Sequence, residues 1–559
     1  MYLNLLRYYI PISENIVPWG DPFTYEMGYY DLLNKIDQNE YYGSIRYIFG
    51  TNWYWLQKIL LFIFSPILIN EPYSLCLINF FTYTVASILF YFLLIELNID
   101  KTFCRILSII FWFYPINYSF KEYSALALMG LDSTFLGSLY CLIFSYLTFL
   151  KKPKDIKYQI SFSIFLCAAL IGRGNSITII FLIIFFPSIF FLYRVYKKKN
   201  FKILKNFKLP LIFFLFTALV FYSLQLKYIL GYYSVFKGFL TNDLSFILPY
   251  LKHIPGIFFI YPDPSEINLM SSTDYSLLLI SLSCHLINIF SFYHQRKLKN
   301  FFIRMIILTG LFIFYGTFLI NLTLWMHPHI NIYNAQLIWA PMRIGFTLTI
   351  SIIILEILKK FKKQNINLLT ILVFSSIFLI SSLLYQNNKE IVFKNKIDSN
   401  PDKIKKIYKF INKNSQNRKI SVLWYDPYLS PRILNYYALK DNLEPIEYFR
   451  GKYADDIWNQ SNKSTQLKNN INQEIKNIFK YSNLIILNEN SDNYVGGYAF
   501  YRYKKFIGEQ IEDNKLDNFK IIAKIKSSRG NLLVFKRQIK GNNNFNYSLD
   551  KNNNYQIIY

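Results

Sequence analysis

The sequence predicts a polytopic α-helical membrane protein with about 10–11 transmembrane helices and a C-terminal soluble α/β domain. Of its 559 residues, 53% are hydrophobic, which is unusual for a soluble chain of this length. The apolar residues gather in blocks of roughly 17–23 residues, the length that an α-helix needs to cross a hydrocarbon core of about 30 Å. After residue 386 the blocks give way to polar residues. These observations place the helices first and the soluble domain after them.

The blocks and their boundaries divide the chain into four predicted parts. Residues 1–75 form an outer-face segment with an acidic motif and a juxtamembrane helix, and residues 76–385 form the transmembrane domain. Residues 386–540 form a periplasmic α/β domain, and residues 541–559 a flexible tail. The predicted spans lie at approximately 76–97, 103–119, 133–150, 158–172, 175–193, 208–226, 274–293, 300–322, 337–358 and 367–385.

Charge in the loops predicts the orientation of these spans. Four loops are strongly basic: KKPKDIK (151–157), RVYKKKNFKILKNFK (194–208), HQRKLKN (294–300) and KKFKK (359–363). Loops of the other set lack Lys and Arg, as in residues 69–73 and 323–336. Because basic loops stay in the cytoplasm, the second set is predicted to face outside. This topology explains the net charge of +27, so we predict no nucleic-acid partner.

The start of the chain leaves two topologies open. Ten spans that end outside require an N-terminus outside, but residues 1–20 contain no apolar segment that would carry it there. In the first, favoured topology, an initial helix is degenerate or missing, and the block at 53–69 is an interfacial helix on the outer leaflet. In the second, residues 53–69 span the membrane and residues 1–50 are cytoplasmic. A further segment, 244–262, reads as interfacial or re-entrant because of its prolines and central charges.

Strand and helix signals alternate in the polar C-terminal region. Residues 401–414 predict a helix that begins at Pro401, residues 419–425 a strand and residues 430–439 a helix. A buried strand follows at 483–488. The segments FKIIAKIK and NLLVFKR, which flank Ser527–Gly530, predict a hairpin. This is the pattern of a small α/β domain.

Ionisable residues near the outer membrane face are the candidate functional residues, because charge at membrane depth is costly. The carboxylates are Asp21 and Glu26, and the cations are Arg173, Arg343 and Lys58. A carboxylate can take the proton of an acceptor hydroxyl, while cations hold a phosphate leaving group. Each also has a structural alternative: Asp21 precedes proline and can form a turn or cap, and the arginines can extend to lipid headgroups.

Metal and cofactor signals are weak. His327 and His329 form an HPH pair in an outer loop, but no third ligand is in view. No cofactor is predicted with certainty, and a divalent metal stays open. The five cysteines all lie in or beside apolar segments, which argues against a disulfide framework. The chain also lacks a phosphate-binding glycine loop, so a cytosolic nucleotide-using enzyme is disfavoured.

Several segments, in order, resemble the C-type glycosyltransferase superfamily (GT-C), whose members are polyprenyl-phosphate-sugar-dependent membrane enzymes. GDPFTYEMGYYDLL (20–33) resembles the acidic motif of the first outer loop. The stretch 52–94 resembles the juxtamembrane helix, short loop and second span, and MGLDSTFLGSLYCLIFSYLTFL (129–150) resembles a helix common in bacterial members. CAALIGRGNSITIIFLII (167–184) resembles the segment where an Arg precedes an outer turn, and the C-terminal hairpin resembles the periplasmic domain. One departure is at the start of the juxtamembrane helix, where Asn52, Trp53 and Tyr54 replace the His-Pro-Pro often seen in the family.

This resemblance implies an activity and roles for the candidate residues. The donor is a polyprenyl-phosphate-linked sugar, whose phosphate Arg173, Arg343 and Lys58 bind. Asp21, with Glu26, deprotonates or orients the acceptor, which is a lipid, a glycan or a protein. The polyprenyl phosphate leaves as the sugar is transferred with inversion at the periplasmic face. Composition and the absence of eukaryotic-style sorting signals favour a bacterial inner membrane, with the lipid bilayer itself as a partner.

Three other classes of function remain open from the sequence. An O-antigen-type polysaccharide polymerase or ligase would use the same compartment and lipid-linked substrates, but its large soluble part usually lies between helices. A transporter or flippase would show internal repeats and charges at the midplane, and neither is visible. A sensor or scaffold would need fewer spans. The glycosyltransferase interpretation is the one that we favour.

Overall fold

The fold was analysed in a computed structural model, in which the chain forms two compact units. The first comprises Met1–Tyr8 with Gln38–Asn388, and the second comprises Tyr9–Asp37 with Lys389–Tyr559. The structure describes residues 40–50, 55–64, 74–113, 131–174, 176–237, 288–298, 300–324, 401–415, 420–422, 481–488, 519–526, 532–538 and 556–558, with single positions among 32–35, 344–351, 434–443 and 469–480 and at 286.

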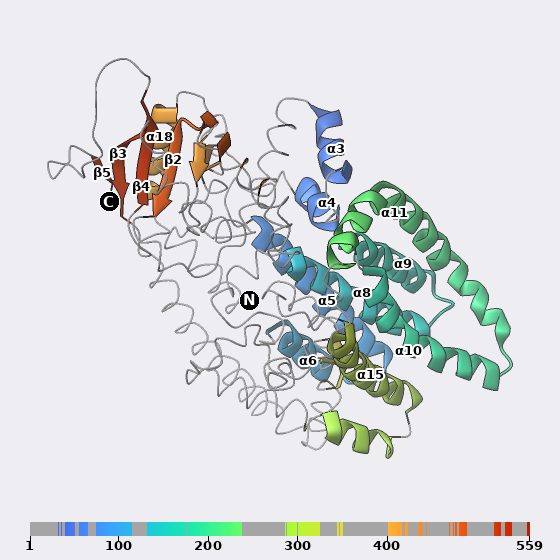
Figure 1. The fold of residues 1–559 in the computed structure, drawn as a ribbon. Coiled ribbons are helices and arrows are strands. Elements are labelled where there is room, and N and C mark those ends of the chain that lie inside the picture. Colours follow the sequence, from blue (N-terminus) through green and yellow to red (C-terminus); the bar gives the residue numbers. More distant parts are fainter. Residues whose placement is uncertain are drawn as a thin grey trace. The chain divides into compact units, whose positions relative to one another are not determined.

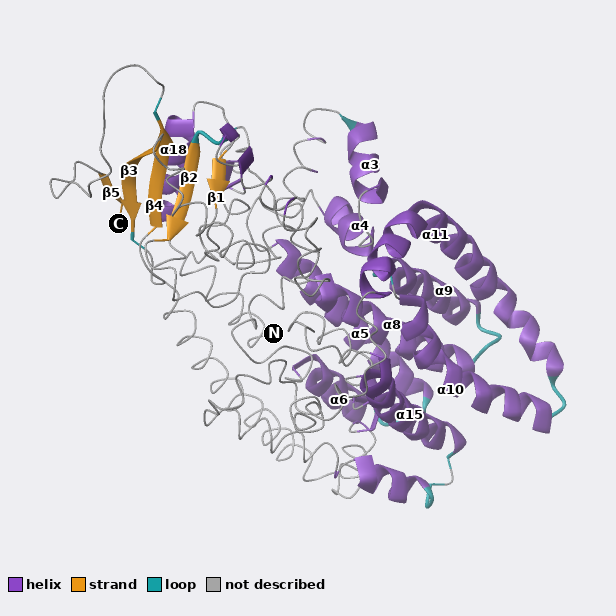
Figure 2. Cartoon of the chain, viewed as in Figure 1, coloured by secondary structure: helices purple, strands orange, loops and turns teal. Residues whose placement is uncertain are grey.

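The described part of the first unit is helical (Figure 2). Its elements are α3 (Tyr41–Gly50), α4 (Trp55–Phe64), α5 (Ser74–Glu96), α6 (Lys101–Phe113), α8 (Leu131–Lys151), α9 (Ile156–Ile171), α10 (Ser176–Lys197), the 3₁₀ helix η2 (Phe201–Phe207), α11 (Lys208–Lys237) and α15 (Phe301–Leu324). Residues 344, 345, 347–349 and 351 are also helical. These elements match seven of the predicted blocks in position, so the helical class is confirmed.

Capping residues explain where several helices begin. The Asp155 carboxylate accepts a hydrogen bond from the Lys157 backbone N–H, 3.2 Å away, and caps α9. Asn300 accepts from the Phe302 N–H at 3.0 Å at the start of α15. Both side chains satisfy N–H groups that have no partner inside the first turn. Each cap therefore fixes the residue at which the chain re-enters a helix after a basic loop.

Helix α8 forms the buried centre of the bundle (Figure 1), packed against α5, α9 and α10. Its aromatic side chains fill the space between neighbours. Phe144 lies 4.8 Å from Phe90 of α5, and Tyr140 lies 5.0 Å from Phe111 of α6, measured between ring centroids. Rings in these tilted and edge-to-face arrangements add a favourable electrostatic term to their burial. Burial on all sides explains why this helix has no charged residue between Asp132 and Lys151.

The outer helices expose the same kind of residue that α8 buries. On α11, Phe216 and Leu219 are each 68% exposed. Within the described residues, the segments Thr134–Lys151, Ile179–Lys197 and Phe201–Leu226 are long and apolar enough to cross a membrane. An apolar surface of this extent is stable only against lipid. The chain is an integral membrane protein.

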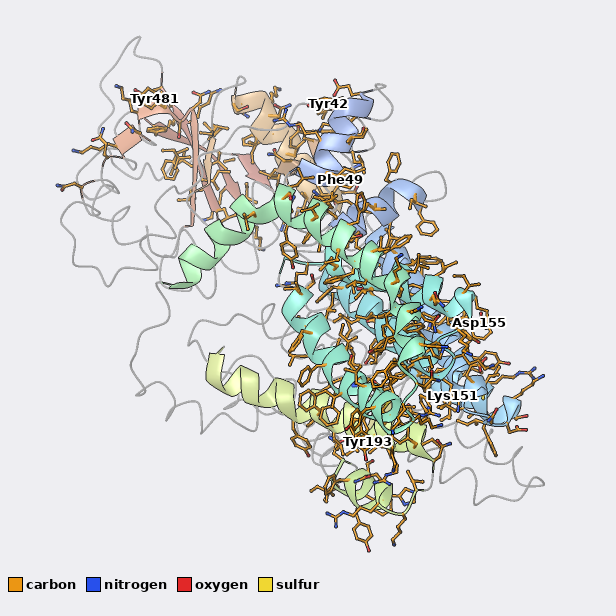
Figure 3. The ribbon with its side chains drawn as sticks, turned by 90° about the vertical axis from the view of Figure 1, so that its right-hand side faces the viewer. Tyr42, Phe49, Lys151, Asp155, Tyr193 and Tyr481 are labelled. Carbon is orange, nitrogen blue, oxygen red and sulfur yellow. The ribbon has the colours of Figure 1, made fainter. Side chains whose placement is uncertain are left out.

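The two ends of the bundle differ in charge. We call the end formed by the turn 151–157, the C-terminal end of α10 and η2 the basic end. Figure 3 shows Lys151, Asp155 and Tyr193 toward this end, and Tyr42 and Phe49 at the opposite end. At the basic end, Glu96 accepts hydrogen bonds from Lys152 at 2.6 Å and from the Tyr158 hydroxyl at 2.5 Å. This cluster joins α5, α8 and α9 where they leave the bundle.

Two glycines bring α15 close to the helical residues 344–351. A Cβ added to Gly345 would collide with the Gly310 carbonyl oxygen and lie 2.7 Å from the Phe314 nitrogen. One added to Gly310 would lie 2.7 Å from the Gly345 carbonyl oxygen. Small residues at such crossings let helix backbones approach closely, which is the main source of packing energy between helices in a membrane.

The second unit contains a five-stranded mixed sheet in the order β1-β2-β4-β3-β5. Its elements are α18 (Pro401–Ser415), β1 (Ile420–Val422), β2 (Leu484–Asn488), β3 (Phe519–Ile525), β4 (Leu532–Arg537) and β5 (Gln556–Ile558). The β3–β4 and β2–β4 pairs are antiparallel, whereas β1–β2 and β3–β5 are parallel. Tyr408 and Ile411 of α18 pack with Ile486 and Val534 of the sheet in one core.

Comparison with the sequence predictions shows agreement and three differences. The helix at 401–414, the strand at 483–488 and the hairpin are present as α18, β2 and β3–β4. Helix α11 continues to Lys237, beyond the predicted span 208–226. Part of the predicted basic loop 194–208 is the helix η2, and Gln556–Ile558 in the predicted tail form β5. The described part of the 53–69 block is the helix α4.

Candidate functional site

Two of the predicted site residues, Arg173 and Lys58, are described by the structure. Arg173 lies in the turn between α9 and α10, and Lys58 lies on α4. The predicted carboxylates and the remaining cation, together with the histidine pair, lie outside the described residues: Asp21, Glu26, Arg343, His327 and His329. The described part of the site therefore consists of two cations and the elements that hold them.

The backbone of Arg173 is fixed by a tight turn against α8. Gly172 ends α9 and donates its N–H to the Ala169 carbonyl oxygen at 3.3 Å. A Cβ on Gly172 would lie 2.7 Å from Cδ2 of Phe135, so glycine allows the turn to rest on α8. Ser176 closes the turn, with its N–H on the Arg173 carbonyl oxygen at 3.2 Å and its hydroxyl on the Leu170 carbonyl oxygen at 2.5 Å.

The exposure of the Arg173 side chain suits contact with a charged ligand. The residue is half-buried, directly after a helix that is embedded in the bundle. A guanidinium carries its charge at every physiological pH and presents several N–H donors in one plane, the geometry that matches a phosphate. The turn thus holds a permanent cation at the end of the bundle opposite the basic end.

A buried polar cluster lies beside this turn, between α5 and α8. The Thr134 hydroxyl donates to Oδ1 of Asn79, and the Thr82 hydroxyl donates to the Asn79 carbonyl oxygen at 2.8 Å. Gly137, one turn after Thr134, allows Thr82 to approach α8 closely. Thr134 precedes Phe135, on which the Arg173 turn rests. The cluster therefore fixes the first turn of α8 against α5 at the level of Arg173.

Helix α4 brings Lys58 to the same end of the bundle. It packs against α5 and α8, which carry the polar cluster, and against α9, which ends at the Arg173 turn. Trp55 anchors it, with its ring 4.9 Å from that of Phe49 on α3 and 4.9 Å from that of Phe221 on α11. Gln225 of α11 donates to the Phe49 carbonyl oxygen at 3.1 Å. These contacts fasten α3 and α4 to α11.

Burial changes the protonation of Lys58. The residue is 6% exposed, and desolvation lowers the pKa of its ammonium group from 10.5 to about 8. The charged form is therefore held at a free-energy cost near neutral pH. An anionic ligand would repay part of this cost and would raise the pKa of Lys58 on binding.

Lys58 predicts a pH dependence of stability. Its pKa is lower in the folded than in the unfolded protein, so the unfolded protein binds more protons between about pH 8 and 10.5. The contribution of Lys58 to the free energy of unfolding therefore rises as the pH increases from about 8 to 10.5. We expect the thermal unfolding midpoint of the wild type in uncharged detergent to rise relative to that of Lys58→Met from pH 8 to 10.5. A pH-independent difference between the two proteins would contradict the assigned pKa.

Sequence reasoning missed the polar cluster. Asn79, Thr82 and Thr134 were not among the predicted site residues, because uncharged polar residues are tolerated in membrane helices. The available signal was Asn79, an amide within the apolar run SLCLINFF. As for metals, the described part of the chain contains no group of three or more His, Cys, Asp or Glu that could hold an ion.

Comparison with solved structures identifies the fold. The chain is similar to the crystal structure of ArnT from Cupriavidus metallidurans bound to undecaprenyl phosphate, with a TM-score of 0.50, 10% identity and 96% coverage of each chain. It is also similar to the same protein in the apo state, with a TM-score of 0.50, 9% identity and 93% coverage of each. ArnT is a GT-C glycosyltransferase. The resemblance to that superfamily is thus confirmed at the level of the fold.

Sequence comparisons return no relatives. No protein-family model matches the chain, and no curated protein matches it significantly. The structural likeness extends over 96% of each chain. Identity of 10% shows the fold alone, so the reaction must be argued from the residues of this chain.

Proposed function

We propose that this protein is a membrane glycosyltransferase that moves a sugar from a polyprenyl-phosphate-linked donor to an envelope acceptor at the periplasmic face. The observation that carries the proposal is the GT-C fold over nearly the whole chain, with Arg173 and Lys58 at the bundle end away from the basic loops. Undecaprenyl phosphate bound in the ArnT structure supports a polyprenyl lipid as the donor carrier. The acceptor is a lipid, a glycan or a protein.

The chemistry assigns different tasks to the cations and the carboxylates. Arg173, Arg343 and Lys58 hold the donor phosphate and stabilise the negative charge that grows on it in the transition state. Asp21, with Glu26 five residues later in the sequence, accepts the proton of the acceptor hydroxyl. The acceptor oxygen forms a bond to the anomeric carbon as the bond to the phosphate oxygen breaks. The polyprenyl phosphate leaves with that electron pair, and the anomeric configuration inverts.

The proposed topology follows from the charge of the two bundle ends. The basic end faces the cytoplasm, and the sheet unit follows the last predicted span on the periplasmic side of a bacterial inner membrane. In spheroplasts, Lys406→Cys on the exposed face of α18 should react with a membrane-impermeant maleimide. Labelling only after the membrane is broken would contradict this orientation.

Metal dependence is a separate part of the proposal. In the chemistry above, cationic side chains stabilise the phosphate, and a divalent metal ion is a second source of the same positive charge. His327 and His329 are the chain's weak candidates for a divalent ion. Transfer measured with and without EDTA, in the wild type and in the double variant His327→Ala/His329→Ala, tests whether an ion at these residues contributes.

The experiment that tests the function is sugar transfer in membranes. Radiolabelled sugar from a panel of polyprenyl-phosphate sugars should appear in an acceptor fraction in the presence of the wild-type protein. Arg173→Gln should lower transfer by about 10²–10³-fold, the usual effect of losing one donor to a developing negative charge. Arg194→Gln is the matched control, because Arg194 is also half-buried in the bundle but lies over Phe301 and Phe302 at the basic end.

The outcomes separate the proposed function from its alternatives. Transfer that falls in Arg173→Gln but not in Arg194→Gln supports the assigned donor site. No transfer from any donor by correctly inserted protein would instead favour a polymerase, a ligase or a transporter of the envelope pathway. An equal loss of transfer in both variants would show that removing either charge lowers activity by impairing the folding of the protein.

A further inference from the structure

The basic end carries a dense group of exposed cations. The sequence places four basic residues in 151–157 and seven in 194–208, with Asp155 as the single acidic residue. We call their exposed surface the basic face, which comprises Lys152, Lys154, Lys157, Lys197, Lys198, Lys199, Lys202, Lys205 and Lys208. Lys152 pairs with Glu96. The excess of positive charge on this face predicts an anionic partner.

Exposed aromatic and aliphatic side chains are interleaved with these lysines. Tyr196 is 73% exposed, Tyr193 57% and Phe201 56%, and Leu204 is also exposed. Tyrosine and phenylalanine beside lysine are typical of surfaces that lie at the level of lipid headgroups. A surface that bound a soluble anion would gain nothing from exposed apolar side chains, which water disfavours.

The backbone under the basic face is fixed by packing and hydrogen bonds. Phe207 of η2 packs on Phe149 of α8 at 4.7 Å and on Phe191 of α10 at 5.5 Å between ring centroids. In the turn before η2, the Lys198 N–H donates to the Arg194 carbonyl oxygen at 3.0 Å. Lys198, Lys202 and Lys205 are therefore carried at defined positions, which lowers the entropy lost when a ligand binds them.

The apolar surface next to the basic face continues along the membrane-spanning helices. Leu192 of α10 is 49% exposed, and Leu211 and Ile212 of α11 are 54% and 51% exposed. A charged region that borders a long apolar one matches an amphiphile, with its headgroup on the lysines and its chains on the helices. The span that begins at Lys208 is itself long enough to cross the membrane, so η2 can remain at the interface.

We propose that the basic face is a binding site for anionic phospholipids, centred on η2 and the C-terminal end of α10. The lysine ammonium groups bind the lipid phosphates, Tyr193, Tyr196 and Phe201 lie among the headgroups, and the acyl chains cover α10 and α11. Lipid binding here anchors the bundle at its basic end. The site lies at the end away from Arg173 and Lys58, so it does not depend on the proposed glycosyltransferase function.

The experiment measures lipid binding by the full chain in an uncharged detergent. Fluorescent phosphatidylglycerol is titrated against the protein, with fluorescent phosphatidylcholine as the zwitterionic reference. The test variant is Lys198→Gln/Lys202→Gln/Lys205→Gln. The control is Lys406→Gln/Lys409→Gln/Lys413→Gln, which removes three exposed charges from α18 in the other unit. Thermal unfolding midpoints in the same detergent show that each variant folds.

The expected result is selective loss in the test variant. Each basic residue near a lipid surface contributes roughly fivefold in affinity, so three together contribute about a hundredfold at low ionic strength. Phosphatidylglycerol binding should fall by that order in the test variant and stay unchanged in the control, and phosphatidylcholine binding should be weak throughout. Equal binding of the two lipids, unchanged binding in the test variant, or displacement by millimolar inorganic phosphate would each overturn the proposal.

Discussion

Asp21→Asn is expected to lower sugar transfer by about 10²–10⁴-fold, the range that a general base contributes. The amide has nearly the shape of the carboxylate but cannot accept a proton from the acceptor hydroxyl. Binding of the donor should change little, because the phosphate is held by Arg173 and the other cations. The loss should therefore appear in kcat rather than in the donor KM. The measurement is initial transfer rate at several donor concentrations, with a full-length and correctly inserted protein.

Asp155→Asn is the matched control for this variant. Asp155 caps α9 at the basic end, and asparagine caps a helix about as well as aspartate, so the same chemical change there should leave transfer intact. Glu26→Gln tests whether Glu26 is itself the base or only orients Asp21 or the acceptor. If Glu26 only orients them, Glu26→Gln should lower the transfer rate less than Asp21→Asn does. Full activity in Asp21→Asn would show that Asp21 is not the base, and the assignment of the fold would not be affected.

Gly345→Val should strongly destabilise the helical unit. The new side chain would meet the Gly310 carbonyl oxygen and the Phe314 backbone, which are main-chain atoms of α15. A flexible side chain could move aside, but a helix backbone can yield only if the two helices separate. Overpacking of this kind costs about 1–3 kcal/mol, and more where backbone must shift. Two hydrogen bonds of the same helix are then strained, Thr347 to Tyr140 at 3.0 Å and Thr349 to Asn288 at 2.7 Å.

The readout is the midpoint of thermal unfolding in detergent. Leu219→Val is the control, because Leu219 lies on α11 with most of its surface exposed toward lipid, so a change of side-chain shape there meets no packed neighbour. Gly310→Val should resemble Gly345→Val, since each glycine accommodates the other's backbone. A midpoint of Gly345→Val within a degree or two of that of Leu219→Val would mean that the two helices do not cross this closely.

The helices could be predicted because their signal is local. A run of apolar residues long enough to span the hydrocarbon core has few alternatives to a helix in a bilayer, where every backbone polar group must be satisfied within the segment. Asp155 and Asn300 were not predicted as caps, although each stands shortly before an apolar run. Helix η2 was missed because its lysines read as a loop, while Phe207 is held by contacts with Phe149 and Phe191 that are distant in sequence.

The candidate site was predictable in part for the same reason. Arg173 was found because a charge in the short turn GRGNS between two apolar blocks is conspicuous in any sequence. The polar cluster of Asn79, Thr82 and Thr134 was not found, because its importance lies in the pairing of two helices that are separated by 55 residues at the Asn79–Thr134 contact. Asp21 and Glu26 stay predictions from the sequence and its resemblance to the GT-C motif.

By itself, the sequence determined that the chain is a helical membrane protein and which ends of its helices are basic. Only the tertiary structure decided that α8 is the buried centre whereas α11 faces lipid, that burial lowers the pKa of Lys58 to about 8, and that the strands follow the order β1-β2-β4-β3-β5. The physical reason is that length, charge and capping are properties of a segment, whereas burial and pairing are properties of its neighbours. In a bilayer both the lipid and the protein core are apolar, so the hydrophobicity of a helix does not determine which of the two surrounds it.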